Sequence, residues 1–113
     1  MNDLPLFPHQ RLDVYLLSRR LAKGVREARV AHAGLRDQAE RASISVFLAI
    51  NEGLPQLSVR MRKQFFLRAK ASLCETVGAL DLAREIGVLD DATWRELHAI
   101  AARVAAILVA LLR

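Results

Sequence analysis

The amino-acid sequence predicts an all-α protein, folded as an antiparallel up-down-up-down four-helix bundle. Apolar residues recur at spacings of three and four in four separate segments, which is the pattern of helices with one buried face. Leucine, alanine and arginine, all good helix formers, are abundant, and the prolines at positions 5, 8 and 55 interrupt none of these segments. The segments are joined by short connections, as in bundles of antiparallel neighbours. With 113 residues the chain can bury one core, so we expect residues 1–113 to form a single domain.

The first segment begins with an extended lead, residues 1–8, before the apolar periodicity starts. Pro8 can open a helix, because the N–H that proline lacks has no partner in a first turn. From there one apolar face continues to about residue 31, and Gly34 predicts the break that follows. This face consists of Val14, Leu17, Leu21, Val25, Ala28 and Ala31.

The second helix is predicted from about Leu35 to Gly53. Gly53 has the position of a C-terminal cap, and Pro55 just beyond it agrees with a helix end. Within this helix, residues 44–50 are apolar at six of seven positions, which is more than one buried face requires. The face expected to point to the core consists of Leu35, Ala39, Ala42, Val46 and Ala49.

Capping residues delimit the third and fourth helices. Ser58 is a good N-cap for the third helix, which is predicted to end at Gly87. Asp90 or Asp91 then caps the fourth helix. An alternative to the bundle is a helical hairpin that completes its core only with a partner. The buried faces are Phe66, Ala69, Leu73, Thr76, Leu80 and Ala83 in the third helix, and Trp94, Leu97, Ala101, Val104, Leu108 and Leu111 in the fourth.

Apolar residues also lie on the outer faces of the second and fourth helices. A single four-helix bundle cannot bury these faces, and each large side chain left in water forfeits about 1.5–3 kcal/mol. We therefore expect a homo-oligomer, with these two helices supplying much of the interface. The alternative is an unusually wide core within one chain. The predicted interface residues are Ile44, Phe47, Leu48, Ala99, Ala102, Ala106, Val109 and Ala110.

The chain is basic, with 17 Lys and Arg against 12 Asp and Glu and a net charge of +5. An arginine-rich surface suits phosphate and carboxylate groups, so nucleic acid is a candidate partner. No aromatic residues alternate with the basic ones, and binding would therefore depend on charge and shape rather than on base stacking. The alternative is an ordinary solvated surface. The candidate nucleic-acid-binding residues are Arg19, Lys23 and Arg26 in the first helix and Arg60, Arg62, Lys63, Arg68 and Lys70 in the third.

The sequence has no pattern typical of a catalytic, metal or cofactor site. Cys74 is the only cysteine, which excludes an internal disulfide and favours a reducing compartment. His9, His32 and His98 lie in separate segments without metal-ligand spacing. A glycine-rich phosphate loop and a nucleophile elbow are both missing. We therefore predict a protein that is not an enzyme, with no catalytic residue, no metal and no cofactor.

Two acids in the predicted second and third helices are candidates for a structural role. Glu52 and Glu75 could each pair with an arginine such as Arg41 or Arg68 and so fix the register of the two helices. Work as a general acid or base is the alternative for both carboxylates.

The ends of the chain lack the features of a secretory or membrane segment. The opening residues MNDLPLFPHQ have no basic region followed by a long apolar one. The longest apolar stretch, residues 100–112, is interrupted by Arg103 and is too short to span a bilayer. A cytoplasmic protein without a membrane partner is the expectation.

Several stretches of the chain resemble the bacterial four-helix bundle proteins, also called the S23 or 23S rRNA intervening-sequence protein family. The stretches are "QAERASISVFLAINEG", then Ser58, "FFLRAKASLCE" and "AREIGVL", and the lead "LFPHQRLDVYLLSRRLA" is similar to the family's opening helix. The chain departs from the family pattern at Ala49, where an asparagine is usual, at Ala71, where a glycine is usual, and at Arg62, where an aromatic residue is common. The matching residues are Gln38, Arg41, Ala42, Ser45, Ile50, Glu52, Gly53, Ser58, Phe65, Ala69, Ser72, Leu73, Glu75, Gly87 and Leu89.

This resemblance implies an antiparallel four-helix bundle that assembles as a ring-like homopentamer. It also implies kinship with the accessory proteins of diversity-generating retroelements, which are basic pentamers thought to bind nucleic acid and a reverse transcriptase. Together with the residue patterns, it predicts a non-enzymatic oligomeric scaffold that binds nucleic acid, in particular structured RNA, through its arginines. The alternative is a protein-interaction module that docks a polypeptide partner and has no direct role with nucleic acid.

Overall fold

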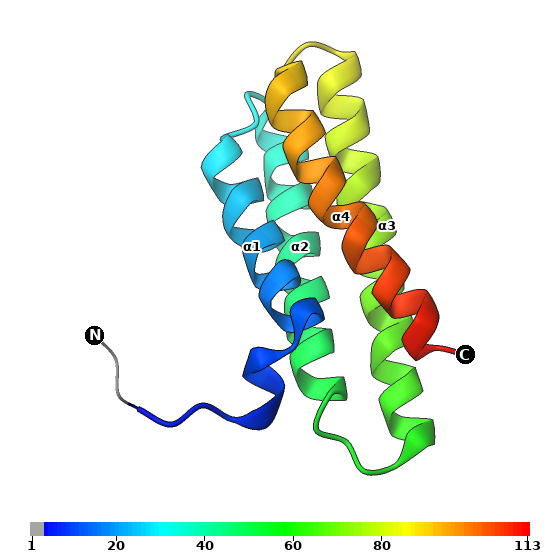
Figure 1. Cartoon of the computed structure of the whole chain (residues 1–113). Coiled ribbons are helices and arrows are strands. Elements are labelled where there is room, and N and C mark those ends of the chain that lie inside the picture. Colours follow the sequence, from blue (N-terminus) through cyan, green and yellow to red (C-terminus); the bar gives the residue numbers. More distant parts are fainter. Residues whose placement is uncertain (1–3) are drawn as a thin grey trace.

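Residues 4–113 are described by a computed structural model, and they form a bundle of four long helices (Figure 1). A 3-10 turn, η1 (Pro8–Arg11), precedes the helices α1 (Asp13–Ala28), α2 (Ala33–Gly53), α3 (Val59–Glu85) and α4 (Asp91–Leu111). Successive helices run in opposite directions, and no strand occurs among the described residues. The predicted all-α four-helix bundle is therefore confirmed.

The helices are arranged so that each has two neighbours. α1 packs on α2 and α4, and α3 packs on the same two helices from the other side, so α1 and α3 are diagonal. The most extensive contact is the one between α2 and α3. The core along the bundle axis contains aliphatic side chains and one phenylalanine, among them Leu21, Val25, Val46, Ile50, Phe66, Leu73, Leu80, Leu97, Val104 and Leu108.

The first helix is shorter than the sequence pattern predicts. Its first residue is Asp13, because Leu12 is in an extended conformation, and it ends at Ala28 because Arg29 adopts a left-handed conformation with φ 48°. Val30 then turns inward and is buried, and the Ala31 N–H donates a hydrogen bond to the Val88 carbonyl of another loop. The predicted end near residue 31 was wrong because these contacts between distant segments end the helix earlier.

Two glycines have other roles than those predicted. Gly34 lies inside the first turn of α2 rather than at the break, and the His32 side chain caps α2 by accepting a hydrogen bond from the Leu35 N–H. Gly53 is the buried last residue of α2 and has no positive φ. A Cβ at Gly53 would lie 2.9 Å from Phe66 Cε1, so this glycine allows α2 to approach α3 closely.

The predicted caps around α3 and α4 are confirmed. Ser58 Oγ accepts a hydrogen bond from the Met61 N–H, and Asp90, rather than Asp91, caps α4 through the Thr93 N–H. After α3, Gly87 has φ 81°, and the Val88 N–H donates to the Ala83 carbonyl at 2.9 Å. This is the hydrogen bond of a Schellman motif, for which glycine is the preferred residue.

The extended lead predicted for residues 1–8 is seen over residues 4–7, while residues 1–3 lie outside the described part. Pro8 already belongs to η1. The Phe7 N–H donates to Gln10 Oε1 at 2.7 Å, and His9 Nε2 is 3.0 Å from Asn51 Oδ1, which fixes η1 to the end of α2. The lead therefore leaves the bundle from a fixed point beside α1 and α2 (Figure 1).

Within residues 4–113, no helix combines the length and the apolar character that crossing a membrane requires.

Candidate functional site

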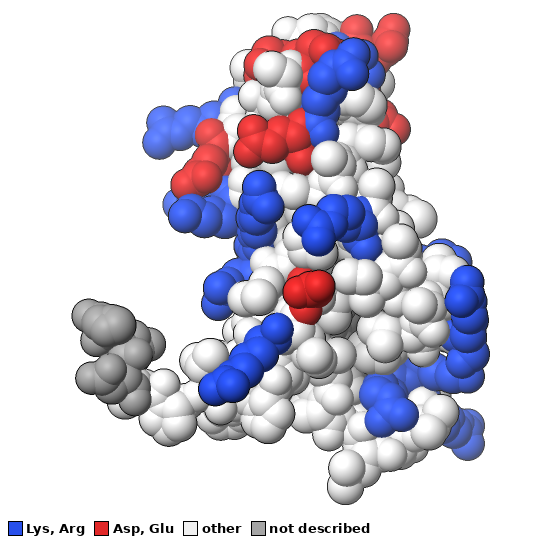
Figure 2. Space-filling view, in the orientation of Figure 1, with Lys and Arg blue, Asp and Glu red and all other residues white. Residues whose placement is uncertain are grey.

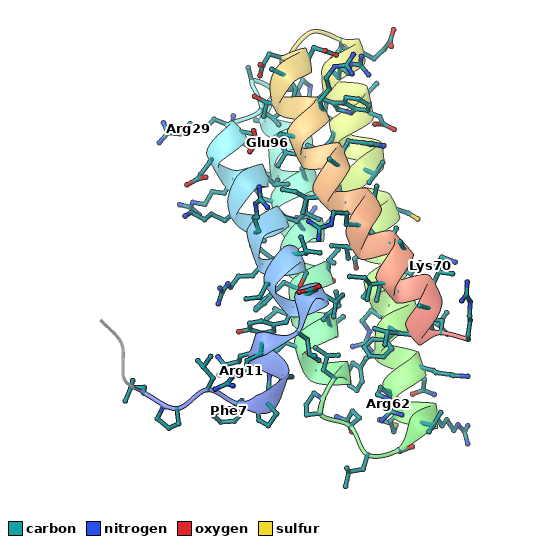
Figure 3. The ribbon with its side chains drawn as sticks, in the orientation of Figure 1. Phe7, Arg11, Arg29, Arg62, Lys70 and Glu96 are labelled. Carbon is teal, nitrogen blue, oxygen red and sulfur yellow. The ribbon has the colours of Figure 1, made fainter. Side chains whose placement is uncertain are left out.

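The basic residues at the start of α3 do not share one face. At about 100° per residue, Arg60, Lys63 and Lys70 lie within about 80° of one another around the helix. Arg60 and Lys70 are exposed, Lys63 is half-buried, and Lys70 lies on the outer side of α3 near the end of α4 (Figure 3). Leu67, 56% exposed, lies between them. We call Arg60, Lys63 and Lys70 the basic face.

The two other arginines predicted in this group have contacts within the chain. Arg62 is half-buried, and its Nη1 donates to the Gln56 carbonyl at 2.7 Å, so it holds the loop between α2 and α3 (Figure 3). The Arg68 guanidinium lies over the Phe65 ring at 5.2 Å, on the side of α3 that faces α2. The structure therefore separates Arg62 and Arg68 from the basic face.

The predicted row on α1 is exposed but lies away from the basic face. Arg19 lies over the Tyr15 ring at 5.5 Å. Lys23 and Arg26 line a shallow depression between α1 and α2, together with two further arginines and two acids, Arg29, Arg36, Glu27 and Glu40. Because α1 and α3 are diagonal in the bundle, one copy of the chain cannot present both rows to the same straight duplex.

Charge is distributed unevenly along the bundle. Between residues 59 and 74, α3 has five basic residues and no acid, whereas residues 75–96 contain six acids and two arginines. Figure 2 shows the result, with basic side chains gathered low on the α3 side and acidic side chains near the connection of α3 to α4. A surface of one sign attracts an oppositely charged partner from solution.

At the acidic end, one aspartate forms both ion pairs found in the described residues. Asp91 is 2.6 Å from Arg84 Nη2 and 2.6 Å from Arg95 Nε. The hydrogen bond from Arg95 lowers the pKa of Asp91, and the positive charge of Arg84 adds to this effect. The pKa of Asp90 is also lowered, because Thr93 donates a hydrogen bond to its carboxylate. These contacts stabilise the start of α4.

The apolar residues predicted for an interface are mostly exposed in the single chain. Ile44 and Leu48 on α2 are 49% and 47% exposed. Phe47 differs, since it is half-buried and its ring packs against Tyr15 of α1 with centroids 5.1 Å apart. On α4 the exposed residues are Ala99, Ala102, Ala106, Val109 and Ala110.

Polar side chains connect α2 and α3 along their contact. Ser45 Oγ is 2.8 Å from Ser72 Oγ, and Gln38 Nε2 donates to Glu75 Oε2 at 3.0 Å. Arg41 Nη2 in turn donates to Gln38 Oε1 at 3.3 Å. Glu75 therefore takes part in the helix contact through an amide rather than through the arginine that the sequence suggested.

The second predicted acid, Glu52, has an exposed side chain. It borders a depression on α2 together with Arg41 and Arg68, but neither arginine forms an ion pair with it among the described residues. Within a single chain, the expected pairing of Glu52 with arginine is thus not made.

The histidines contact different parts of the molecule, and no group of three or more His, Cys, Asp or Glu within residues 4–113 could hold a metal ion. His98 stacks on Trp94 at 4.6 Å, and Arg84 lies 4.0 Å from the centre of the same indole. Trp94 Nε1 also donates to Asp81 at 2.9 Å. Sequence reasoning missed this stack, although the spacing of four between Trp94 and His98 indicates that the two rings are neighbours on a helix.

Five of the polar residues that carry the family resemblance meet at one place, the contact between α2 and α3. The sequence model of the 23S rRNA-intervening sequence protein family matches residues 10–110. The chain belongs to this family. The match covers α1, α2 and α3 and all but the last residue of α4, so the family pattern and the bundle describe the same part of the chain. Among curated proteins no similar chain is found. The five polar residues at the contact between α2 and α3 are Gln38, Arg41, Ser45, Ser72 and Glu75.

Proposed function

We propose that this member of the family is a non-enzymatic, homo-oligomeric scaffold that binds structured RNA in the cytoplasm through arginine and lysine side chains. The observation that carries the proposal is the uneven charge of α3. Its first sixteen residues contain five basic side chains and no acid, and three of them form the basic face.

The basic face suits a phosphate backbone better than it suits bases. Arg60, Lys63 and Lys70 extend over ten residues of helix, or about 15 Å at 1.5 Å per residue. The side chain between them is Leu67, and no aromatic residue shares this face on which a base could stack. Double-stranded RNA is recognised mainly by its shape and its phosphates, which is the kind of contact that this face offers.

Assembly would repeat the basic face and strengthen weak binding. Ile44 and Leu48 on α2 and the alanine-rich side of α4 are exposed in one chain, and burying them between copies would be favourable. The family resemblance implies five copies in a ring. Several basic faces on one particle can bind several segments of a folded RNA at once, and this raises the overall affinity without new contacts.

The RNA proposal is tested by measuring binding of a fluorescent double-stranded RNA at several salt concentrations. We expect the logarithm of the affinity to fall linearly with the logarithm of salt concentration. The triple variant Arg60→Gln/Lys63→Gln/Lys70→Gln should reduce that slope by about one unit for each phosphate that it no longer neutralises. The control variant Arg11→Gln/Arg20→Gln/Arg103→Gln removes the same charge from exposed arginines elsewhere and should bind more tightly than the first. Equal losses of affinity in both variants, or no binding at low salt, would refute the proposal.

The proposed assembly is tested by light scattering of the purified protein. A single chain has a mass of 12.6 kDa, and we expect a multiple of this value. Leu48→Glu and Ala106→Glu place a charge on exposed apolar positions, so each should dissociate the assembly while the helix content remains. A wild-type mass of one chain contradicts the assembly, and two variants that stay assembled contradict the chosen faces.

A second candidate function, docking of a polypeptide partner, is favoured by the apolar character of the exposed faces. Ile44 and Leu48 lie between Arg41 and Glu52, as apolar residues with a polar rim do in protein interfaces. A partner retained in equal amount after nuclease treatment supports this function, and loss of all bound material on nuclease treatment supports RNA binding.

A further inference from the structure

An apolar groove lies between α3 and α4, on the side of the bundle away from α1 and α2. Its volume is about 380 Å³. Asp81 and His98 close one end, and the rest of the lining is almost entirely carbon. The apolar lining includes Leu73, Val77, Gly78, Ala101, Ala102 and Ala105.

Nothing in the structure of a single chain explains why position 78 is a glycine. It lies in the middle of α3, where glycine is less favourable than alanine. A Cβ at this position would meet nothing within 4 Å, so packing inside the bundle does not require the glycine. Gly53 makes the contrast clear, because there a Cβ would collide with Phe66. An occupant that comes close to the α3 backbone from outside would account for glycine at position 78.

The lead, residues 4–7, has the properties of a segment that could bind in this apolar groove, because it is exposed, partly apolar and extended. Leu6 and Phe7 are 48% and 69% exposed, and the Phe7 ring contacts the His9 ring edge to face, with centroids 6.0 Å apart, while most of its surface is open to solvent (Figure 3). The backbone of Phe7 is extended, with φ −68° and ψ 146°, and Pro5 and Pro8 on either side disfavour a helix. Because η1 is fixed to α2, the lead is already in an extended shape that can lie in a groove at a small loss of conformational freedom.

The lead and the groove have similar lengths. The lead of a chain cannot, however, reach the groove of the same chain. Residues 4–7 span about 10 Å when extended, at about 3.3 Å per residue. The groove follows α3 from Leu73 to Asp81, or about 12 Å at 1.5 Å per residue. The lead starts beside α1 and α2, whereas the groove lies on the opposite side of the bundle, too far for four residues to reach (Figure 1).

We propose that the lead of one copy, residues 4–7, binds in the α3–α4 groove of a second copy, with Leu6 and Phe7 against Val77, Gly78 and Ala102. The inference rests on the proposed self-assembly and names a contact within it. Each copy gives its lead and receives another through a different surface. Such a head-to-tail contact forms a closed ring when the rotation between neighbours completes a circle.

The native cysteine makes a direct test possible. Cys74 borders the groove, is exposed and is the only cysteine of the chain. In the variants Leu6→Cys and Phe7→Cys, treated with a mild copper–phenanthroline oxidant, the two thiols should join as a disulfide between copies. Non-reducing gels should then show covalent dimers and higher species that disappear with reductant or with Cys74→Ser added.

The matched control is Leu57→Cys, which places a thiol on the α2–α3 loop at a residue that is 96% exposed. This variant should not join to Cys74, because the loop is not part of the proposed contact. Cross-links in Leu57→Cys as strong as those in Phe7→Cys would overturn the proposal, as would their lack in both lead variants.

Two further variants separate this proposal from the assembly itself. Gly78→Leu fills the groove from inside and should raise the thermal stability of the single bundle, since leucine favours helix, while weakening association by about tenfold or more. Phe7→Asp should weaken association to a similar extent. If the wild-type protein assembles and Phe7→Asp assembles equally well, the assembly stands and the lead contact is wrong. If only Gly78→Leu dissociates, another segment of the second copy fills the groove, and the proposal also fails.

Discussion

Within a single chain, α3 is closely packed and hydrogen-bonded on the side that faces α2, but it borders an open groove on the side that faces α4. Toward α2, Gly53 lets the helices approach closely, and hydrogen bonds join Ser45 to Ser72 and Gln38 to Glu75. Toward α4, a groove remains open beside Gly78, whose missing side chain nothing in the chain replaces.

This difference indicates which residues of the sequence are explained by contacts within one chain and which are not. Five polar residues shared with the family, Gln38, Arg41, Ser45, Ser72 and Glu75, bond along the α2 side, so their pattern is explained by the fold of the single bundle. Gly78 and the exposed Ala102 on the α4 side have no such explanation in one chain, and we therefore assign them to contacts between copies.

The largest effect is expected from the aromatic ring that fills the α2 side. Phe66 is 1% exposed, and Phe66→Ala should lower the free energy of unfolding by about 3–5 kcal/mol, because it removes buried carbon and leaves a cavity. The neighbouring Leu67 is 56% exposed, and Leu67→Ala should change the free energy of unfolding by less than about 0.5 kcal/mol. Urea denaturation of both variants measures the difference, and equal losses would contradict the distinction between buried and exposed positions on α3.

Replacing glycine by alanine should change the stability of the protein in opposite directions at the α2–α3 contact and beside the α3–α4 groove. Gly53→Ala places a Cβ against Phe65 and Phe66 and should destabilise the protein by about 1–3 kcal/mol. Gly78→Ala meets open space and should stabilise the single bundle by up to about 1 kcal/mol. The measurement is chemical denaturation at a concentration where the chains are dissociated. Destabilisation by Gly78→Ala under these conditions would show that the space beside Gly78 is filled within one chain.

A smaller effect is expected from the hydroxyl pair between α2 and α3. Ser72→Ala should cost about 0.5–1.5 kcal/mol, because Ser45 is left without its partner in a partly buried place. The double variant Ser45→Ala/Ser72→Ala should cost less than the sum of the two single changes, as expected for residues in contact. On the α4 side, the exposed Trp94–Asp81 hydrogen bond should show weaker coupling in the same kind of cycle. Additive effects at the serines would contradict a hydrogen bond between them.

The smallest effect concerns the ion pairs of Asp91 and follows from its pKa. The pKa is lowered in the folded protein, so the folded state binds fewer protons than the unfolded state around pH 4. The stabilisation is present above the ordinary value of 3.8 and is lost as pH falls through the lower folded value. Asp91→Asn should therefore narrow the difference in melting temperature between pH 7 and pH 3. If the melting temperature of the variant differs between pH 7 and pH 3 as much as that of the wild type, the ion pairs contribute nothing to stability.

The sequence was sufficient wherever a structural feature depends on residues close along the chain. The four helices, the cap at Ser58 and the turn at Gly87 each follow from a local pattern and were predicted, and the cap of α4 was predicted to be Asp90 or Asp91. The α1 end at Ala28 depends instead on the hydrogen bond between Ala31 and Val88, which are 57 residues apart, so no local pattern contains it.

The same reason applies to the candidate site. Spacing alone places Arg60, Lys63 and Lys70 on one side of a helix, because the helix period is fixed. The same spacing turns Arg62 and Arg68 away from that side. What only the folded chain shows is their partners, the Gln56 carbonyl of the α2–α3 loop for Arg62 and the Phe65 ring for Arg68.

By itself, the sequence determined that the protein is a bundle of four amphipathic helices with a basic segment in the third, because helix periodicity and charge are properties of the chain. The tertiary structure decided that Gly53 serves close packing, that Glu75 bonds to Gln38, and that a groove remains open beside Gly78. These features depend on which helix surfaces meet, and that is settled only when segments distant in the sequence pack together.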